Sequence, residues 1–197
     1  MKVGILGGTF DPIHNGHVSL ALSMQKAKGL DEVWFVVAGI NPLKQKKDTA
    51  PAHHRIAMVK RAIETYPGFK CVTVECEREG PSYTIDTLKQ LQSTHPENQY
   101  FLIMGADVIS HFMQWKDPLD ILDIAEPLVA MRDRREVLDL FQLPDSLAKK
   151  IEKGIVKIPI KEISSTNIRD CIRKELNIED LVPEKVIDYI SKFGLYS

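Results

Sequence analysis

The sequence predicts an α/β protein with a doubly wound, Rossmann-like and mostly parallel sheet that carries helices on both faces. Short apolar runs of strand length alternate with helix-like segments along the whole chain. Some of these runs are hydrophobic at consecutive positions, which is typical of strands buried on both faces. The unusual motifs of the chain come directly after strands, where doubly wound sheets bind their ligands.

The chain begins with two expected strands and one helix. Val3–Leu6 is an apolar run of strand length, and His17–Lys28 is a helix-like segment. Gly29 follows this segment, and glycine is common directly after the last turn of a helix. Val33–Ala38 reads V-W-F-V-V-A, and its β-branched and aromatic residues predict a fully buried strand. A polar loop with three lysines follows at Gly39–Thr49 and leads to the next helix.

The same alternation continues through the middle of the chain. Ala52–Thr65 has the apolar spacing of an amphipathic helix, Lys70–Glu75 is expected as a strand, and Tyr83–Ser93 is expected as a helix. Cys71 and Cys76 fall in the apparent strand, five residues apart. Their side chains are therefore expected on opposite faces of the sheet.

Three more strands and two helices are expected after residue 99. The strands are Tyr100–Met104, Pro127–Met131 and Ile155–Pro159. One helix runs from residues 164–166 to about Lys174. The closing helix, Pro183–Phe193, has proline near its first turn, where the missing N–H costs no hydrogen bond.

The composition fits one globular domain. At 197 residues, 44% of them hydrophobic and 27% charged, the chain can bury one core, so we expect a single domain at 1–197 with a helical segment from about 164. The net charge of −1 argues against nucleic acid and anionic membranes as partners, and the apolar runs are too short to span a bilayer. Three cysteines without paired spacing predict no disulfide framework and no zinc site, and the first strand leaves no room for a signal peptide. The expected location is the cytoplasm, and whether the chain forms a homo-oligomer stays open.

Residues 7–17 read G-G-T-F-D-P-I-H-N-G-H, directly after the first strand. Glycines lack a Cβ, so their backbone N–H groups can approach phosphate oxygens closely. His14 and His17 lie about one helical turn apart and can face the same polyphosphate. The motif lacks the G-K-[ST] of a P-loop and the G-x-G-x-x-G of dinucleotide folds. It predicts a nucleoside triphosphate site, against the alternative of a glycine turn with two incidental histidines.

Residues 163–169 read I-S-S-T-N-I-R at the start of a helix. A single hydroxyl residue would be enough to cap this helix, which is the structural alternative. Three successive hydroxyl residues, free backbone N–H groups and the guanidinium of Arg169 would instead converge on an anion. Combined with the first motif, this pattern predicts a second contact to the polyphosphate.

Together, the two motifs resemble those of the H-x-G-H nucleotidyltransferases, a superfamily that includes the class I aminoacyl-tRNA synthetases. Residues 77–88 (E-R-E-G-P-S-Y-T-I-D-T-L), residues 105–107 (G-A-D) and Trp115 are similar to the bacterial nicotinate mononucleotide adenylyltransferases, over essentially the whole chain. The resemblance implies transfer of the adenylyl group of ATP to nicotinate mononucleotide, giving nicotinate adenine dinucleotide (NaAD) and pyrophosphate in NAD synthesis. It also implies Mg²⁺ as cofactor, held mainly by phosphates and water rather than by a protein metal site.

The resemblance further implies which residues contact the substrates. The catalytic set would be His14, His17, Thr166 and Arg169. The ATP site would comprise Gly7, Gly8, Thr9, Phe10, His14, His17, Gly105, Asp107, Ser165, Thr166 and Arg169. The nicotinate mononucleotide site would comprise Lys44, Tyr83, Thr84, Trp115 and Arg132, with Trp115 stacked on the pyridine ring. As structural alternatives, Asp107 would cap a helix and Trp115 would fill the core, to which Trp34 is assigned.

The chain departs from the family pattern in three places. The usual P-N-x-x-P-P-H-K is V-A-G-I-N-P-L-K at residues 37–44, and the usual R-P-G is R-D-R at residues 132–134. Lys116 stands where an aromatic residue often follows the tryptophan. None of these changes touches the residues assigned to the ATP phosphates.

Three alternative functions keep part of this interpretation. Nicotinamide mononucleotide is an alternative acceptor, because the choice depends on whether a carboxylate or an amide fits beside Thr84. Phosphopantetheine is disfavoured as acceptor, because its enzymes generally have threonine in place of His14 and lack S-Y-T-I-D-T-L. A binding module without catalysis is disfavoured because His14, His17, Thr166 and Arg169 are all present.

Overall fold

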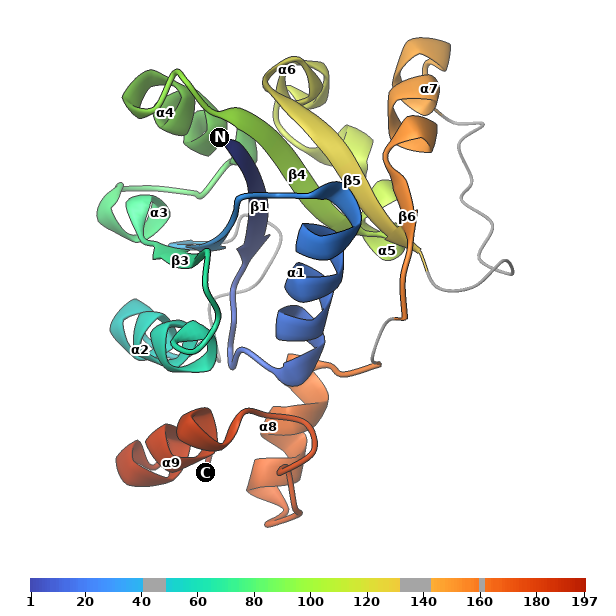
Figure 1. Cartoon of the computed structure of the whole chain (residues 1–197). Helices are drawn as coiled ribbons and strands as arrows, with labels where there is room; N and C mark the ends of the chain where they lie inside the picture. The colour runs from blue at the N-terminus through green and yellow to red at the C-terminus, as the bar shows by residue number, and fades with distance from the viewer. Residues whose placement is uncertain (41–48, 132–142, 160–161) are drawn as a thin grey trace.

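A six-stranded parallel sheet forms the centre of the computed structural model, which describes residues 1–40, 49–131, 143–159 and 162–197 (Figure 1). The strands are β1 (Lys2–Gly8), β2 (Glu32–Val37), β3 (Phe69–Val72), β4 (Gln99–Gly105), β5 (Ala125–Met131) and β6 (Ile155–Lys157). Their order is β3-β2-β1-β4-β5-β6, and every neighbouring pair is parallel. The winding reverses between β1 and β4, so a crevice is expected outside the carboxyl ends of these two strands.

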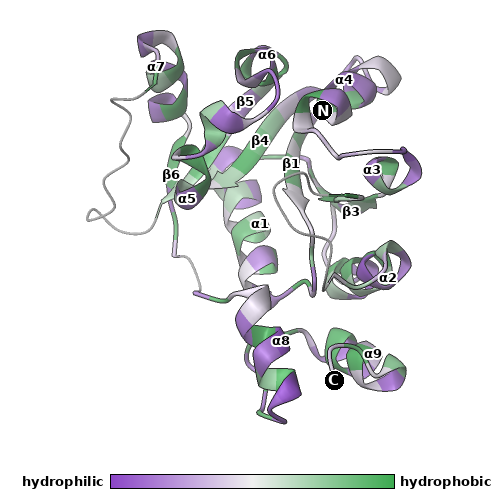
Figure 2. Cartoon of the chain, turned by 180° about the vertical axis from the view of Figure 1, so that it is seen from behind, coloured by the Kyte–Doolittle hydropathy of each residue, from purple (hydrophilic) through white to green (hydrophobic). Residues whose placement is uncertain are grey.

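Helices cover both faces of this sheet, which confirms the predicted doubly wound fold. One face carries α1 (Asn15–Lys28) and α2 (Ala52–Ile63), and α8 (Ser165–Arg173) and α9 (Glu184–Phe193) join the same core. The other face carries α4 (Thr84–Thr94), α5 (Ala106–Ile109), the 3-10 turn η2 (Phe112–Gln114), α6 (Pro118–Ile124) and α7 (Asp145–Lys153). Coloured by hydropathy, the central strands are largely apolar, whereas the helices mix polar and apolar colours (Figure 2).

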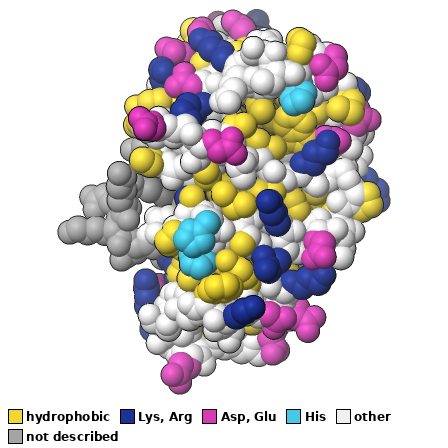
Figure 3. All heavy atoms as spheres, turned by 90° about the vertical axis from the view of Figure 1, so that its left-hand side faces the viewer, with side chains coloured by type: hydrophobic (Ala, Val, Ile, Leu, Met, Phe, Trp, Pro, Cys, Tyr) yellow, Lys and Arg dark blue, Asp and Glu magenta, His cyan; other side chains and the backbone are white. Residues whose placement is uncertain are grey.

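The outer surface over α2 and α9 carries side chains of both charges. Basic and acidic side chains lie interspersed on this face (Figure 3). Lys185 of α9, for example, pairs with Glu64 at the end of α2 at 2.9 Å. In the described part of the chain, no helix is long and apolar enough to cross a membrane.

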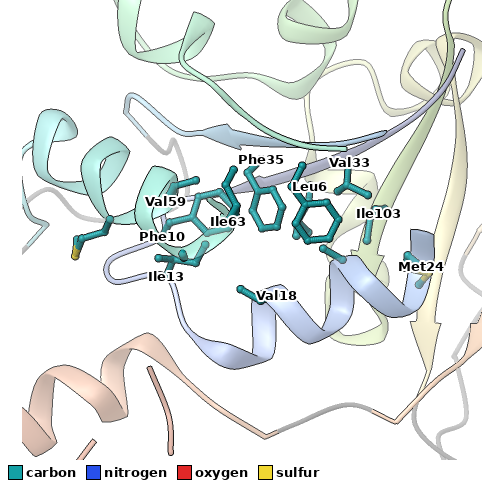
Figure 4. Close-up of a cluster of buried hydrophobic side chains, with 14 of the residues drawn as sticks. Leu6, Phe10, Ile13, Val18, Met24, Val33, Phe35, Val59, Ile63 and Ile103 are labelled. Atoms are coloured by element: carbon teal, nitrogen blue, oxygen red, sulfur yellow. The ribbon is translucent and has the colours of Figure 1, made fainter. Parts of the chain in front are cut away.

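Strand β2 shows how one strand contributes to two cores. Val33, Phe35 and Val37 belong to the core under α1 and α2, whereas Trp34 and Val36 belong to the core under α4 and α6. This division follows from the alternation of side chains along an extended strand. Figure 4 shows the first core, which lies between the sheet and α1. The assignment of Trp34 to the core is thereby confirmed.

The expected strand Lys70–Glu75 is wrong in its second half, because β3 ends at Val72 and α3 (Val74–Glu77) follows. Acidic residues in the first turn favour a helix start, and Thr73 bonds to the Glu77 carboxylate across this turn. Cys76 therefore lies on helix α3 rather than on the sheet. From this helix its thiol donates to the Val37 carbonyl at 3.2 Å. Sequence analysis also missed α6 and α7, which are too short to show a clear helical period.

Candidate active site

A cavity of about 1030 Å³ opens at the carboxyl ends of β1 and β4. This volume lies just above the range of about 300–1,000 Å³ that is usual for small-molecule sites. The predicted site residues that line it are Gly7, Gly8, His14, His17, Tyr83, Thr84, Gly105, Asp107 and Trp115. The fold therefore brings some residues of each predicted site to one cavity, whereas Thr9, Phe10, Ser165, Thr166 and Arg169 are not on its wall.

The turn after β1 explains the two glycines. Gly7 lies on the cavity wall, with open space where a Cβ would stand. A Cβ on Gly8 would lie 2.9 Å from the ring of Phe10, so a glycine lets this ring fold back under the strand end. Phe10 adopts a positive φ of 51° and buries its side chain in the core. The ring of Phe10 contacts the His17 ring edge-on, with 5.0 Å between centroids, so the Phe10 side chain helps to fix the position of the His17 ring.

The two histidines of the motif face each other at the start of α1. Their rings stack with 3.7 Å between centroids, and the backbone N–H of His14 donates to Nδ1 of His17 at 3.3 Å. Because this Nδ1 accepts a hydrogen bond, a neutral His17 carries its proton on Nε2. Burial lowers the pKa of His14 from 6.5 to about 4, because desolvation disfavours the imidazolium. At neutral pH without substrate, His14 is therefore uncharged.

Helix α8, near the C-terminal end of the chain, contacts the loop between β1 and α1. Arg169 donates from Nη1 to the carbonyl of Asp11 at 2.8 Å and from Nη2 to Oγ1 of Thr166 at 3.3 Å. Ser165 donates from Oγ to the carbonyl of Pro12 at 2.9 Å. The second predicted motif thus packs on the first, although these three predicted residues lie beside the cavity rather than on its wall.

Three buried polar atoms around this loop have no hydrogen-bond partner among the described residues. They are Oγ1 of Thr9, Nδ1 of His14 and Nε of Arg169. A buried polar atom without a partner costs about 1–3 kcal/mol. Ser164 and Asn167 of the second motif line the cavity close by. Such a group of unpaired atoms is expected where a polar ligand completes the site.

Sequence analysis missed two buried charged residues that hold the loop in place. Arg55 of α2 is 2% exposed and donates to the carbonyls of Thr9 at 2.9 Å and Ala38 at 2.6 Å, which joins the ends of β1 and β2. Asp11 is 5% exposed and accepts the N–H of Ala50 at 3.1 Å. Buried charges need such partners to offset desolvation. The signal available in the sequence was the place of Arg55 on the apolar stripe of its helix.

The opposite wall of the cavity carries the aromatic residues. Trp115 is partly buried and packs against Phe112 of η2, with 5.3 Å between ring centroids, while it also lines the cavity. Its predicted ligand contact and its core-filling alternative are therefore compatible. Nζ of Lys116 lies 5.0 Å from the ring centroid of Tyr83 and pairs with Asp86 at 3.0 Å. A cation thus stands at this wall, already paired with a carboxylate of α4.

The starts of two helices also border the cavity. In α4, the N–H groups of Asp86 and Thr87 bind the Tyr83 carbonyl, whereas those of Thr84 and Ile85 bind no described residue. Such N–H groups at a helix start are available to an anion.

In α5 the N-cap residue is Gly105, so the alternative of Asp107 as helix cap is wrong. Asp107 follows in the first turn, where it is exposed and faces the cavity.

Glu75 of α3 is a buried carboxyl on the cavity wall that sequence analysis did not select. Thr87 donates from Oγ1 to its Oε1 at 2.7 Å. Burial raises the pKa of Glu75, although hydrogen bonds from Thr87 and Ser82 oppose this shift. Ser82 in turn accepts the N–H of Gly39 on its Oγ at 3.0 Å. Glu75 therefore connects the exit of β2 to the segment that leads into α4.

Two predicted acceptor contacts, Lys44 and Arg132, lie outside the described residues and stay predictions. Among the residues that the structure describes, no group of three or more His, Cys, Asp or Glu side chains could hold a metal ion. The described lining of the cavity includes the imidazoles of His14 and His17 and the rings of Tyr83 and Trp115.

Comparisons with known proteins agree with this geometry. A family model described as cytidylyltransferase-like matches residues 5–171. The nicotinate-nucleotide adenylyltransferase of Bacillus subtilis (strain 168) is 39% identical over 195 residues, which cover 99% of this chain and 98% of that protein. A probable nicotinate-nucleotide adenylyltransferase of Bacillus pumilus (strain SAFR-032) is 36% identical with the same coverage. The structure of Plasmodium falciparum nicotinic acid mononucleotide adenylyltransferase complexed with NaAD matches with a TM-score of 0.75 and 25% identity, covering 99% of this chain and 97% of that chain.

Proposed function

The chain belongs to the nicotinate-nucleotide adenylyltransferases of the cytidylyltransferase-like family, and on this premise we propose that it transfers the adenylyl group of ATP to nicotinate mononucleotide. The products are NaAD and pyrophosphate. The observation that carries the proposal is the single cavity that joins the histidine pair to the wall of Trp115, Tyr83 and Thr84.

The chemistry requires little from the protein in the way of acid or base. An oxygen of the 5′-phosphate of the mononucleotide attacks the α-phosphorus of ATP. The bond between the α-phosphorus and the oxygen that bridges it to the β-phosphorus breaks, and this oxygen leaves with pyrophosphate. The phosphate monoester is already a competent nucleophile, so no side chain has to activate it. The protein must align the two phosphates and stabilise the charge that develops on the departing pyrophosphate.

We assign this charge stabilisation to His14, His17, Thr166 and Arg169. Support comes from the stacked histidines at the start of α1 and from the guanidinium that contacts the same loop. Neutral His14 and His17 can each donate one hydrogen bond from an imidazole N–H. The unpaired buried Nε of Arg169 and Nδ1 of His14 support a ligand at this end of the cavity.

Mg²⁺ would enter with ATP as part of the substrate. Mg²⁺ keeps several of its waters and is often bound through substrate phosphates. When bound, the ion would neutralise charge on the phosphates. Positions of the phosphates themselves would still depend on the donors of the two motifs.

We assign the acceptor to the wall that carries Trp115. The indole would stack on the pyridine ring, and the N–H groups of Thr84 and Ile85 would bind the carboxylate. Gly105 and Asp107 would face the adenosine at the end of β4. By resemblance, Lys44 and Arg132 would contact the mononucleotide as well. We further infer action on small molecules in the cytoplasm, without nucleic acid or membrane partners.

The direct test is pyrophosphate release from ATP and Mg²⁺ with three acceptors in parallel. We expect release with nicotinate mononucleotide and much less with nicotinamide mononucleotide or phosphopantetheine. If only nicotinamide mononucleotide supports pyrophosphate release, it replaces nicotinate mononucleotide as the proposed acceptor, and adenylyl transfer from ATP stays the proposed reaction. No release with any acceptor would contradict the proposal.

A variant of the histidine pair tests the assignment of residues. His17→Ala should lower turnover by about 10²–10³-fold, the usual loss when one donor to a transition-state charge is removed. His53→Ala, at an exposed position of α2, is the matched control and should turn over normally. Near-normal turnover of His17→Ala, with the cavity otherwise intact, would remove His17 from the mechanism.

A further inference from the structure

The hydroxyl of Tyr196 contacts the loop that joins β1 to α1, although Tyr196 lies far along the chain from this loop. It donates to Oδ1 of Asp11 at 2.7 Å, across 185 positions of sequence. Tyr196 adopts a positive φ of 71°, a conformation that disfavours residues with a Cβ. An unfavourable backbone geometry persists only where surrounding contacts hold it in place, and such residues gather at functional sites.

Asp11, the partner of this hydroxyl, is itself a connecting residue. Its Oδ1 also accepts the N–H of Ala50 at 3.1 Å, and its Oδ2 lies 3.8 Å from Nη1 of Arg169. The backbone carbonyl of Asp11 accepts the same Nη1 at 2.8 Å. Asp11 therefore contacts the Arg169 guanidinium through both its main chain and its side chain.

Arg169 depends on these contacts for its orientation. Its Nη2 donates to Thr166 at 3.3 Å, and its buried Nε has no described partner. An arginine side chain has many rotamers, and freedom that remains before binding is lost when the ligand binds. A guanidinium that is already oriented by Asp11 meets a phosphate with less loss of freedom.

The Tyr196 hydroxyl keeps its proton under all ordinary conditions. Burial raises the pKa of Tyr196, and the Asp11 carboxylate raises it further, while Arg169 and Arg55 act in the opposite direction. The phenol is therefore a permanent donor to the carboxylate.

We propose that Tyr196 is a positioning residue for adenylyl transfer, whose hydroxyl orients the Asp11 carboxylate and, through it, the Arg169 guanidinium toward the ATP phosphates. The role of Arg169 in this inference rests on the proposed function. The contacts from Tyr196 to Asp11 and from Asp11 to Arg169 do not depend on it.

The test compares Tyr196→Phe with Ser197→Ala, which removes a neighbouring hydroxyl that donates to the Gly194 carbonyl at 3.0 Å. We expect Tyr196→Phe to lower kcat about tenfold, less than the hundredfold cost of a 1 Å misplacement, with KM for nicotinate mononucleotide unchanged. Calorimetry without acceptor should show weaker ATP binding. Ser197→Ala should match the wild type in both measurements. A Tyr196→Phe protein that melts at lower temperature but keeps kcat and ATP affinity would overturn the proposal.

A second comparison separates positioning from a general loss of structure. In an Arg169→Lys background the planar fork that Asp11 orients is absent, so Tyr196→Phe should cause no further loss of kcat. An equal loss in both backgrounds would overturn the proposal. If the wild type itself transfers adenylyl to no acceptor, the proposed function fails. The ATP affinities of Tyr196→Phe and Ser197→Ala then decide the positioning role by themselves.

Discussion

Lowering the pH should destabilise the protein through His14. The side chain is 5% exposed, its Nδ1 has no partner among the described residues, and desolvation lowers its pKa from 6.5 to about 4. Between pH 6.5 and pH 4 the folded protein therefore holds His14 neutral, whereas the unfolded chain binds a proton there. Stability consequently falls as the pH falls through this window, and the effect levels off below pH 4.

The size of the effect follows from the two pKa values. A difference of about 2.5 between them corresponds to about 3 kcal/mol at full protonation, at 1.36 kcal/mol for each pKa unit. At pH 5, where His14 of the unfolded chain is almost fully charged, about 2 kcal/mol is lost relative to pH 8.

Urea unfolding of the wild type and His14→Asn at pH 8 and pH 5 measures this loss. The free energy of unfolding of the variant is subtracted from that of the wild type at each pH. This difference should be about 2 kcal/mol larger at pH 8 than at pH 5. Other titrating groups, such as Glu75 and Glu32, are common to both proteins, so the comparison removes their contribution.

Val18→Ala, at a buried position of α1, the helix that His14 precedes as N-cap, serves as the control for this measurement. It forms a cavity and should destabilise the protein equally at both pH values. If the difference between wild type and His14→Asn is the same at pH 8 and pH 5, His14 is not held neutral by burial and the reasoning fails.

Four further predictions follow from the site. ATP binding at pH 6 should be coupled to proton uptake, because the negative charge of a phosphate beside His14 would raise its pKa. The binding enthalpy should therefore differ between buffers of different ionisation enthalpy. Equal enthalpies in these buffers would contradict this prediction. Gly39→Ala should raise KM for the acceptor severalfold, because a Cβ would collide with the carbonyl oxygen of Glu75, a residue of the cavity wall. An unchanged KM would count against the cavity wall around Glu75 as part of the acceptor site. Arg55→Met should lower the free energy of unfolding by about 3 kcal/mol, because the carbonyls that it binds lose their donors at about 1–3 kcal/mol each; urea unfolding with a loss below about 1 kcal/mol would refute this. EDTA should stop pyrophosphate release and Mg²⁺ should restore it, and activity that persists without divalent metal would contradict a Mg²⁺–ATP substrate.

The residues that sequence analysis found are those whose chemistry shows in local spacing. His14 and His17 are three positions apart, and the structure stacks them at the start of one helix as that spacing predicts. The strand pattern likewise gave the doubly wound sheet, because runs buried on both faces are visible without knowledge of their partners. Short helices such as α6 and α7 were missed, since less than three turns carry little periodic signal.

The residues that sequence analysis missed depend on contacts between distant segments. Arg55 shows in the sequence as a cation on an apolar helix face, but its partners Thr9 and Ala38 lie 46 and 17 positions away. Asp11 is inside the first motif, yet no local pattern indicates that Tyr196 reaches its carboxylate. The sequence thus indicates the residues predicted to contact the substrate, whereas the contacts that hold their loop in place are seen only in the tertiary fold.

Arg55 and Arg169, which contact the loop between β1 and α1, differ from His14 in their charge before a ligand binds. Arg55 and Arg169 each donate to main-chain carbonyls, so their positive charge is oriented before any substrate arrives. His14, whose ring stacks on that of His17 at 3.7 Å, is neutral at that stage because burial lowers its pKa. Negative phosphates would reverse this balance, since they favour the imidazolium that burial disfavours. On the proposed function, His14 would therefore gain its charge only when the phosphates bind, whereas the guanidiniums of Arg55 and Arg169 are charged and oriented beforehand.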